Sequence, residues 1–233
     1  MRDTIIFDFD GTLIDSAPGI LATYAEVFSV AGLTPAVPLD ATLIGPPLQP
    51  TMAKLLGEAL SNSDPALLEK LVADFKPRYA TTGVARTPAY PDADHALRLL
   101  REHGYTLYLA TNKRASPTLA LLEKFGWQQH FRRVYCIDSQ LPAFADKTAM
   151  LRQLLAENAL APERCLYIGD TRGDYLSASA CSIEFAAALW GYEDWNALAD
   201  KEPMLRHASA SLAELPRRLQ AGATITPAST QPS

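Results

Sequence analysis

The amino-acid sequence predicts an α/β protein with a doubly wound, mainly parallel sheet and an inserted helical domain. Three observations lead to this fold class. From Pro88 onward, short apolar runs alternate with amphipathic helical patterns, which is typical of parallel strands connected by helices. The long segment between the first strand and Pro88 carries helical patterns only. Polar residues follow several of the predicted strands, and such sheets bind their ligands beyond the carboxyl ends of the strands.

The first strand is predicted at residues 4–9, where apolar, β-branched and aromatic side chains form a short run. Asp8 and Asp10 lie at the end of this run, two residues apart, and Gly11 gives the backbone the freedom to turn away from the sheet. Two neighbouring carboxylates repel each other unless a cation or a shared proton compensates their charge. We therefore expect a divalent metal ion at this strand end.

A helical domain is predicted at residues 16–83. Its apolar side chains recur at helical spacing, and prolines interrupt the pattern, for example directly after Gly45. A helical block of this size between two strands is typical of a separate small domain placed over a binding site. We expect residues 1–15 and 84–222 to form the α/β core, and residues 223–233, which offer almost nothing to bury, to be a disordered tail.

Four further strands are predicted in the second half of the chain. They span residues 105–110, 133–137, 164–168 and, more weakly, 183–187, with amphipathic helical patterns before and between them. Two of these strands are followed by polar clusters. The clusters are Thr111-Asn112-Lys113 and Gly169-Asp170 with Asp174. Because the carboxyl ends of parallel strands meet at one edge of the sheet, we expect these clusters to lie near Asp8 and Asp10.

Composition and charge limit the class of protein and the kinds of partner. With 233 residues, of which 48% are hydrophobic and 20% charged, the chain can bury a full core. The formal charge of −5 gives no basic surface field, so we expect no nucleic-acid partner. The sequence contains neither a targeting pattern nor an apolar run of about eighteen residues, so we expect no membrane partner and a cytoplasmic location.

Four groups of residues together resemble the four motifs of the haloacid dehalogenase superfamily, in the same order and at suitable spacing. They are Asp8-Phe9-Asp10-Gly11-Thr12, Thr111-Asn112-Lys113, Lys147, and Gly169-Asp170 with Asp174. The helical segment after the first group resembles a type-1 cap, as in the phosphoglycolate phosphatase-like branch, and the resemblance extends to about Gln220. It implies a Rossmann-like core and a Mg²⁺-dependent phosphatase that hydrolyses a small phosphate monoester through an aspartyl-phosphate intermediate.

The chemistry of phosphate esters explains why such motif residues are needed. An anionic phosphoryl group repels nucleophiles, so the site needs a positioned nucleophile, a cation and donors to the phosphoryl oxygens. By resemblance, Asp8 is the nucleophile, while Asp10 protonates the leaving oxygen and later takes a proton from the attacking water. The residues expected to bind the substrate phosphate are Gly11, Thr111, Asn112 and Lys147.

The resemblance also implies a Mg²⁺ site, built from the acidic motif residues. Mg²⁺ prefers oxygen ligands and keeps several waters, so it needs few ligands from the protein. The residues expected at the metal are Asp8, Asp10 through its carbonyl, Asp170, and Asp174, which would steady the metal or one of its waters.

Other polar residues near the motifs receive weaker interpretations. In the helical domain, Gly45 in a rigid turn and Arg78 are candidates for reading the leaving group of the substrate. Lys113 and Arg114 are expected to be solvated loop charges.

The substrate and the reaction class stay open among several alternatives. The expected partner is a small phosphorylated metabolite, with phosphoglycolate as the first choice, and a 5'-nucleotidase or a pyrophosphatase activity behind it. A phosphosugar mutase would share the core and differ in the cap. A haloacid dehalogenase would have no use for Asp10 or Mg²⁺, and a non-catalytic binding module would usually lack one of the charged motif residues. A monomer and a homodimer are both compatible with the sequence.

Overall fold

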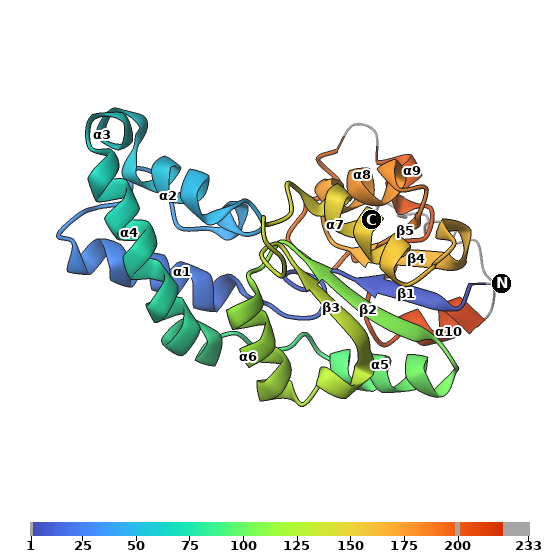
Figure 1. Cartoon of the computed structure of the whole chain (residues 1–233). Coiled ribbons are helices and arrows are strands. Elements are labelled where there is room, and N and C mark those ends of the chain that lie inside the picture. Colours follow the sequence, from blue (N-terminus) through green and yellow to red (C-terminus); the bar gives the residue numbers. More distant parts are fainter. Residues whose placement is uncertain (1, 199–200, 221–233) are drawn as a thin grey trace, which may run out of the picture.

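The computed structural model describes residues 2–198 and 201–220, and Figure 1 shows their arrangement. Within these residues, five parallel strands form one sheet in the order β3-β2-β1-β4-β5. The strands are β1 (Thr4–Phe7), β2 (Thr106–Thr111), β3 (Phe131–Cys136), β4 (Cys165–Gly169) and β5 (Glu184–Ala187). The predicted α/β class with a parallel sheet is therefore confirmed. The predicted tail at residues 223–233 lies outside the described residues.

The central strand of the sheet is β1, which has β2 on one side and β4 on the other. Its residue Ile6 lies opposite Tyr108 of β2 and Tyr167 of β4. After β1, the chain adds β2 and then β3 on one side of β1. It then returns and adds β4 and β5 on the other side. Doubly wound sheets bind ligands at such a reversal, in the crevice beyond the carboxyl ends of the strands. The predicted site residues after β1 and β4 lie at this position.

The chain turns sharply after β1, which ends at Phe7, two residues earlier than predicted. The ladder continues for one more hydrogen bond, since the amide of Asp8 donates to a carbonyl of β4 at 2.8 Å. The carbonyl of Phe9 then accepts a hydrogen bond from the amide of Leu13 at 2.9 Å, which closes a turn. Gly11 lies inside this turn with a φ of +78°, a backbone conformation that favours glycine.

Helices cover both faces of the sheet (Figure 1), because successive strand residues point to opposite sides. Ile5 faces the layer of α5 (Ala93–Glu102), α6 (Ala115–Phe125) and α10 (Leu215–Gln220). Ile6 faces the layer of α7 (Lys147–Glu157), α8 (Arg172–Ala180) and α9 (Glu202–Leu205). The two layers each bury a separate apolar cluster against the sheet. No helix in the described part of the chain is long and apolar enough to cross a lipid bilayer.

The helices that come between β1 and α5 in the sequence form a group beyond the carboxyl edge of the sheet (Figure 1). We call this group the cap. It consists of α1 (Ala17–Val30), a 3-10 helix (Ala41–Leu43), α2 (Leu48–Leu56), α3 (Glu58–Ser63), α4 (Pro65–Arg78), a π-helical turn at Tyr79–Gly83 and the segments that connect them. The helical character predicted for residues 16–83 is thus observed. The division of the chain into a core and an independent cap domain stays a prediction.

The two ends of the cap touch each other through glycines. A side-chain carbon at Gly19 of α1 would lie 2.3 Å from the carbonyl oxygen of Gly83, so the close approach requires glycine there. The segment after Gly83 is fastened to the layer of α6, because the Lys124 ammonium donates to the carbonyls of Val84 at 3.0 Å and Thr87 at 2.8 Å. The end of the cap is therefore held against the core.

Candidate active site

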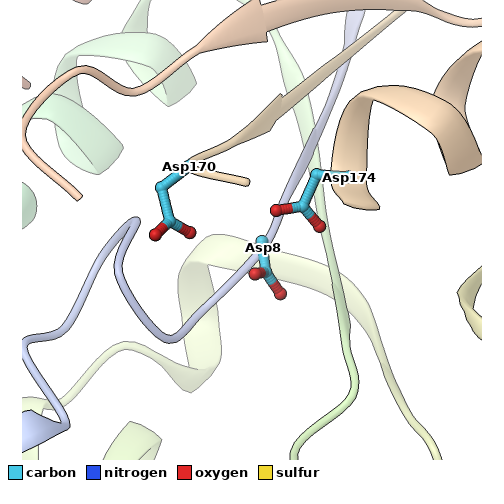
Figure 2. A group of neighbouring side chains, drawn as sticks. All are labelled: Asp8, Asp170 and Asp174. Atoms are coloured by element: carbon cyan, nitrogen blue, oxygen red, sulfur yellow. The ribbon is translucent and has the colours of Figure 1, made fainter. Parts of the chain in front are cut away.

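The predicted site residues come together at the carboxyl edge of the sheet. Asp8 follows β1, Thr111 ends β2 and Asp170 follows β4. Lys147 is the first residue of α7, and Asp174 lies in the first turn of α8. Figure 2 shows the carboxylates of Asp8, Asp170 and Asp174 as neighbours. Residues that are far apart in the sequence thus form one polar site.

Three buried carboxylates form a compact acidic cluster. One oxygen each from Asp8, Asp170 and Asp174 lies within 4.8 Å of the others, and at most 6% of any of these residues is exposed. Burial raises the pKa of Asp8 to about 7, although the charge of Lys147 lowers it. Burial, with the charges of Asp174 and Asp8, raises the pKa of Asp170 well above its usual 3.8. Lys147 therefore does not compensate the cluster fully, and the oxygen donors fit a divalent cation such as Mg²⁺.

Lys147 lies between two of the carboxylates. Its ammonium nitrogen is 2.9 Å from Oδ1 of Asp8 and 2.5 Å from Oδ1 of Asp174, and its side chain is 7% exposed. Burial alone would lower the pKa of Lys147, but the charges of Asp174 and Asp8 hold the pKa well above 10.5. The lysine is therefore a permanent positive charge beside Asp8.

Both oxygens of Asp174 already have partners in the protein. Oδ1 accepts hydrogen bonds from Lys147 and, at 3.3 Å, from the Tyr167 hydroxyl. Oδ2 accepts from the amide of Thr171 at 3.0 Å and from its hydroxyl at 2.7 Å, and Thr171 caps α8 in return. In this arrangement Asp174 holds Lys147 in place and, with Thr171, caps the first turn of α8. Its expected role at a metal stays a prediction.

Asp170 is enclosed by glycines on two sides. A side-chain carbon at Gly11 would lie 2.0 Å from Oδ2 of Asp170, and one at Gly191 would lie 2.1 Å from its Cβ. The carboxylate accepts hydrogen bonds from the Thr12 hydroxyl at 3.3 Å and from the Tyr192 amide at 2.9 Å. Only glycine leaves room for Asp170 to pack this closely against the turn after β1. Gly11 therefore contributes space for the acidic cluster.

The sequence did not identify the segment Trp190-Gly191-Tyr192, which supports the site from beyond β5. The indole nitrogen of Trp190 donates to the carbonyl of Thr12 at 3.0 Å. The Tyr192 hydroxyl donates to Asp15 Oδ1 at 2.9 Å and accepts from the amide of Ala17 at 3.0 Å. The segment thus connects Asp170 with the start of α1. The sequence feature that could have indicated this segment is a glycine between two aromatic residues, shortly after a strand.

Asp10 is not a member of the acidic cluster, and its carboxylate pairs with Lys113. The lysine ammonium lies 2.8 Å from Oδ1 of Asp10 and donates to the Tyr79 hydroxyl at 2.7 Å. The Lys113 side chain is only 6% exposed, so the expectation that it is a solvated loop charge is wrong. The physical reason is a turn after β2: the amide of Lys113 donates to the Thr111 hydroxyl at 3.1 Å, and the side chain extends under the cap. Burial alone would lower the pKa of Lys113, but Asp10 and Tyr79 raise it.

Arg114 and the two cap candidates occupy different surroundings. The Arg114 side chain is 56% exposed and pairs with Asp138, as expected for a solvated charge. Arg78 is not among the residues that line the cavity between cap and core; its guanidinium lies 3.5 Å from Glu26 of α1. Its position therefore does not favour the predicted contact with a leaving group. Gly45 does line the cavity.

A cavity of about 990 Å³ lies between the cap and the core. Its core wall contains the polar residues Asp8, Asp10, Thr111, Asn112, Lys147 and Asp174. Its cap wall is largely apolar and aromatic, with Ile20, Tyr24, Leu43, Leu48, Phe75 and Tyr79. The cavity therefore places a charged reaction centre below an apolar roof. Such a shape suits a ligand with one anionic end.

The chain is similar to known proteins over most of its length. It is 31% identical to a phosphoglycolate phosphatase of Xanthomonas campestris pv. campestris over 219 residues, which cover 91% of this chain and 93% of the relative. It is also 31% identical to a 5'-nucleotidase of Pseudomonas aeruginosa over 220 residues, with coverages of 93% and 95%.

The comparisons with solved structures and with protein families agree on one family. A haloacid dehalogenase-like family hydrolase from Streptococcus pneumoniae superposes with a TM-score of 0.80 and 26% identity, covering 94% of this chain and 99% of that one. A family model described as haloacid dehalogenase-like hydrolase matches residues 5–188. With the motif residues gathered at one site, the chain therefore belongs to the haloacid dehalogenase-like hydrolase family.

Proposed function

We propose that this enzyme is a Mg²⁺-dependent phosphatase that hydrolyses a small phosphate monoester through an aspartyl-phosphate at Asp8. One observation carries the proposal: the buried carboxylate of Asp8 lines the cavity, lies 2.9 Å from the Lys147 ammonium and belongs to the acidic cluster with Asp170. A carboxylate so placed can attack phosphorus while neighbouring charges compensate the phosphoryl group. The phosphatases among the relatives support the same reaction class.

The roles that the resemblance implies for the two aspartates of the first motif give a reaction in two steps. An oxygen of Asp8 attacks phosphorus, the bond from phosphorus to the ester oxygen breaks, and Asp10 gives its proton to the leaving alcohol. Water then attacks the phosphorylated Asp8, Asp10 takes a proton from that water, and the bond between phosphorus and Asp8 breaks. Inorganic phosphate leaves, and both aspartates return to their initial states.

The remaining charged groups would hold the phosphoryl group and its counterion. Asp8, the carbonyl of Asp10 and Asp170 would bind Mg²⁺, which would neutralise charge on the phosphoryl oxygens and on Asp8. Thr111 and Asn112, at the end of β2, would donate hydrogen bonds to those oxygens, and Lys147 would add a fixed positive charge. The turn around Gly11 would let the backbone approach the phosphate closely.

Phosphoglycolate is the first candidate substrate, because relatives named phosphoglycolate phosphatase cover most of this chain. A nucleoside 5'-monophosphate is the second, and the cavity itself favours it. The cap wall is apolar and aromatic, and the cavity is large for a two-carbon leaving group. Among the cations that line the cavity, Lys113 and Arg114 pair with Asp10 and Asp138, whereas Lys76 of α4 has no ion pair within the described residues. A second anionic group on the substrate would therefore compete with a carboxylate at Lys113 or Arg114, but not at Lys76.

A panel of phosphate monoesters tests the function. Phosphate release is measured from phosphoglycolate, nucleoside monophosphates, pyrophosphate and phosphosugars, with Mg²⁺ and with EDTA, and Asp8→Asn serves as the control. We expect Mg²⁺-dependent release that the variant lacks, and one phosphoryl group on the Asp8 peptide of acid-quenched wild-type enzyme by mass spectrometry. Isomerised phosphosugar without phosphate release would show a mutase instead. Phosphate release without a phosphoryl group on the Asp8 peptide would count against the covalent route.

A further inference from the structure

Lys113 connects the acid–base candidate of the core with the cap. Its ammonium lies 2.8 Å from Oδ1 of Asp10 and 2.7 Å from the Tyr79 hydroxyl oxygen. The three residues come from three separate places: the turn after β1, the loop after β2 and the π-helical turn at the end of the cap. The Lys113 side chain is 6% exposed and that of Asp10 is 15% exposed, so water screens this bridge little.

Tyr79 is firmly attached to the cap. Its ring stacks on Phe75 of α4 with a centroid distance of 5.6 Å, and Phe75 packs on Tyr24 of α1 at 4.7 Å. On its other side the ring lies against Gly83, where an added side-chain carbon would be 2.3 Å from Cδ2 of Tyr79. The position of the Tyr79 hydroxyl therefore follows the position of α1 and α4.

Lys113 itself is attached to the core. Its amide is bonded to the Thr111 hydroxyl at the end of β2, and the next residues begin α6. Asp10 belongs to the core as well, since it sits in the turn that packs on Asp170. A displacement of the cap away from the sheet would therefore draw the Tyr79 hydroxyl away from Lys113.

The bridge leaves Asp10 with one fixed and one available oxygen. Oδ1 is bound to Lys113, and no other side chain in residues 2–198 or 201–220 is hydrogen-bonded to this carboxylate. Asp10 also lines the cavity. An ammonium has three donors, of which two are used here, so Lys113 can hold Asp10 and Tyr79 at the same time. The carboxylate is thereby prevented from rotating freely.

We propose that Lys113 is a positioning residue that fixes the Asp10 carboxylate for proton exchange with the leaving group, and that Tyr79 couples this position to the placement of the cap. The inference rests on the proposed phosphatase function. It assigns to Lys113 a role through Asp10, with no contact to the substrate. Positioning of an acid–base group to within about 1 Å is worth about 100-fold in rate, so the loss of the bridge has a measurable effect.

The test uses the leaving group as the readout. Phenyl phosphate needs a proton on its departing phenol oxygen, whereas 2,4-dinitrophenyl phosphate releases 2,4-dinitrophenolate, a stable anion that needs no proton. The ratio kcat/KM reports only the steps up to departure of the phenol. In Lys113→Met, which keeps the aliphatic chain and removes the ammonium, we expect kcat/KM to fall about 10- to 100-fold for phenyl phosphate and less than about threefold for the dinitrophenyl ester. Asp10→Asn should show the same selectivity more strongly.

Two further variants separate positioning from general structural damage. Tyr79→Phe removes only the hydroxyl and keeps the stacked ring. Because Tyr79 acts through Lys113, the double variant should have the same kcat/KM as Lys113→Met alone. Lys124→Met is the matched control, because this lysine fastens the end of the cap through backbone carbonyls and does not reach Asp10. Its effect should be equal for both esters.

Crystal structures and kinetics together decide the outcome. In Lys113→Met we expect the Asp10 carboxylate to leave the position seen here, with the melting temperature within a few degrees of the wild type. An equal loss of kcat/KM for both esters, or a rise in KM alone, would overturn the role of Lys113 while the phosphatase function stands. A wild-type enzyme without Mg²⁺-dependent activity on any monoester would instead refute the phosphatase function.

Discussion

The metal-free protein should lose stability as the pH rises from about 4 to above 7, and Mg²⁺ should restore it. The cause is the buried carboxyl group of Asp8, whose pKa is about 7 in the folded protein instead of the ordinary 3.8. Folding therefore favours the protonated form of Asp8. Its contribution to the free energy of unfolding is fully present below the pKa of the unfolded chain and is lost as the pH rises through the folded pKa.

The size of the effect follows from the two pKa values. At about 1.4 kcal/mol for each pH unit between 3.8 and about 7, ionised Asp8 reduces the free energy of unfolding by about 4 kcal/mol at high pH. Between pH 5 and pH 8 the same relation gives a decrease of about 3 kcal/mol. For a chain of this length, that corresponds to about 6–12 °C in melting temperature.

Thermal melts in EDTA and in excess Mg²⁺, at pH 5 and at pH 8, measure the effect. Asp8→Asn is the matched control, because it keeps the shape of the side chain and removes the titrating group. We expect the wild type in EDTA to melt several degrees lower at pH 8 than at pH 5, relative to the variant, and Mg²⁺ to reverse most of this difference. If the wild type and the variant showed the same pH dependence in EDTA, the charge of Asp8 would not be a source of instability. An unchanged melting temperature in Mg²⁺ would count against the metal site.

Three other substitutions test individual contacts. Asp8→Asn should reduce turnover by about 1000-fold or more while circular dichroism stays unchanged, because the nucleophile is lost, and substantial residual activity would rule out attack by Asp8. Gly191→Ala should destabilise the protein by about 1–3 kcal/mol in urea unfolding, since the new carbon would lie 2.1 Å from Asp170 Cβ. An unchanged unfolding midpoint would show that the segment around residue 191 can shift at little energetic cost. Asp174→Asn should lower kcat about 10- to 100-fold, because Asp174 holds Lys147 in place. The Mg²⁺ concentration for half-maximal activity should stay nearly unchanged. A large rise in that concentration would instead show that Asp174 is a metal ligand.

Much of the fold could be predicted from the sequence, because its strands are short, apolar and separated by helices with a clear periodicity. Burial on both faces of a parallel sheet makes strands such as Cys165–Gly169 uniformly apolar. The meeting of Asp8 and Asp170 could also be foreseen, since the carboxyl ends of parallel strands converge. The bounds of the strands were less accurate, as the turn after Phe7 shows.

The direction of long polar side chains could not be predicted from the sequence. The sequence predicts a solvated loop charge at Lys113, because neither its neighbours in the chain nor its spacing reveals the contact with Tyr79 of the cap. The sequence offers Arg78 as a candidate for reading the leaving group, whereas its guanidinium lies 3.5 Å from Glu26 of α1. In both cases a contact with a residue from a distant part of the chain determines the direction of the charged side chain. Tyr192 could not be predicted for the same reason, because its hydroxyl contacts Asp15, a residue far away in the sequence.

The structure also changes the explanation for the two acidic residues of the first motif. Their spacing suggested one pair of repelling carboxylates that share a cation. In the described residues, the carboxylate of Asp8 belongs to the acidic cluster and pairs with Lys147, whereas that of Asp10 faces the cap and pairs with Lys113. Each carboxylate therefore has its own lysine, supplied by a different strand-to-helix connection. This separation suits different chemical tasks, because a nucleophile benefits from staying near the metal and an acid–base group must face the side where the leaving group departs.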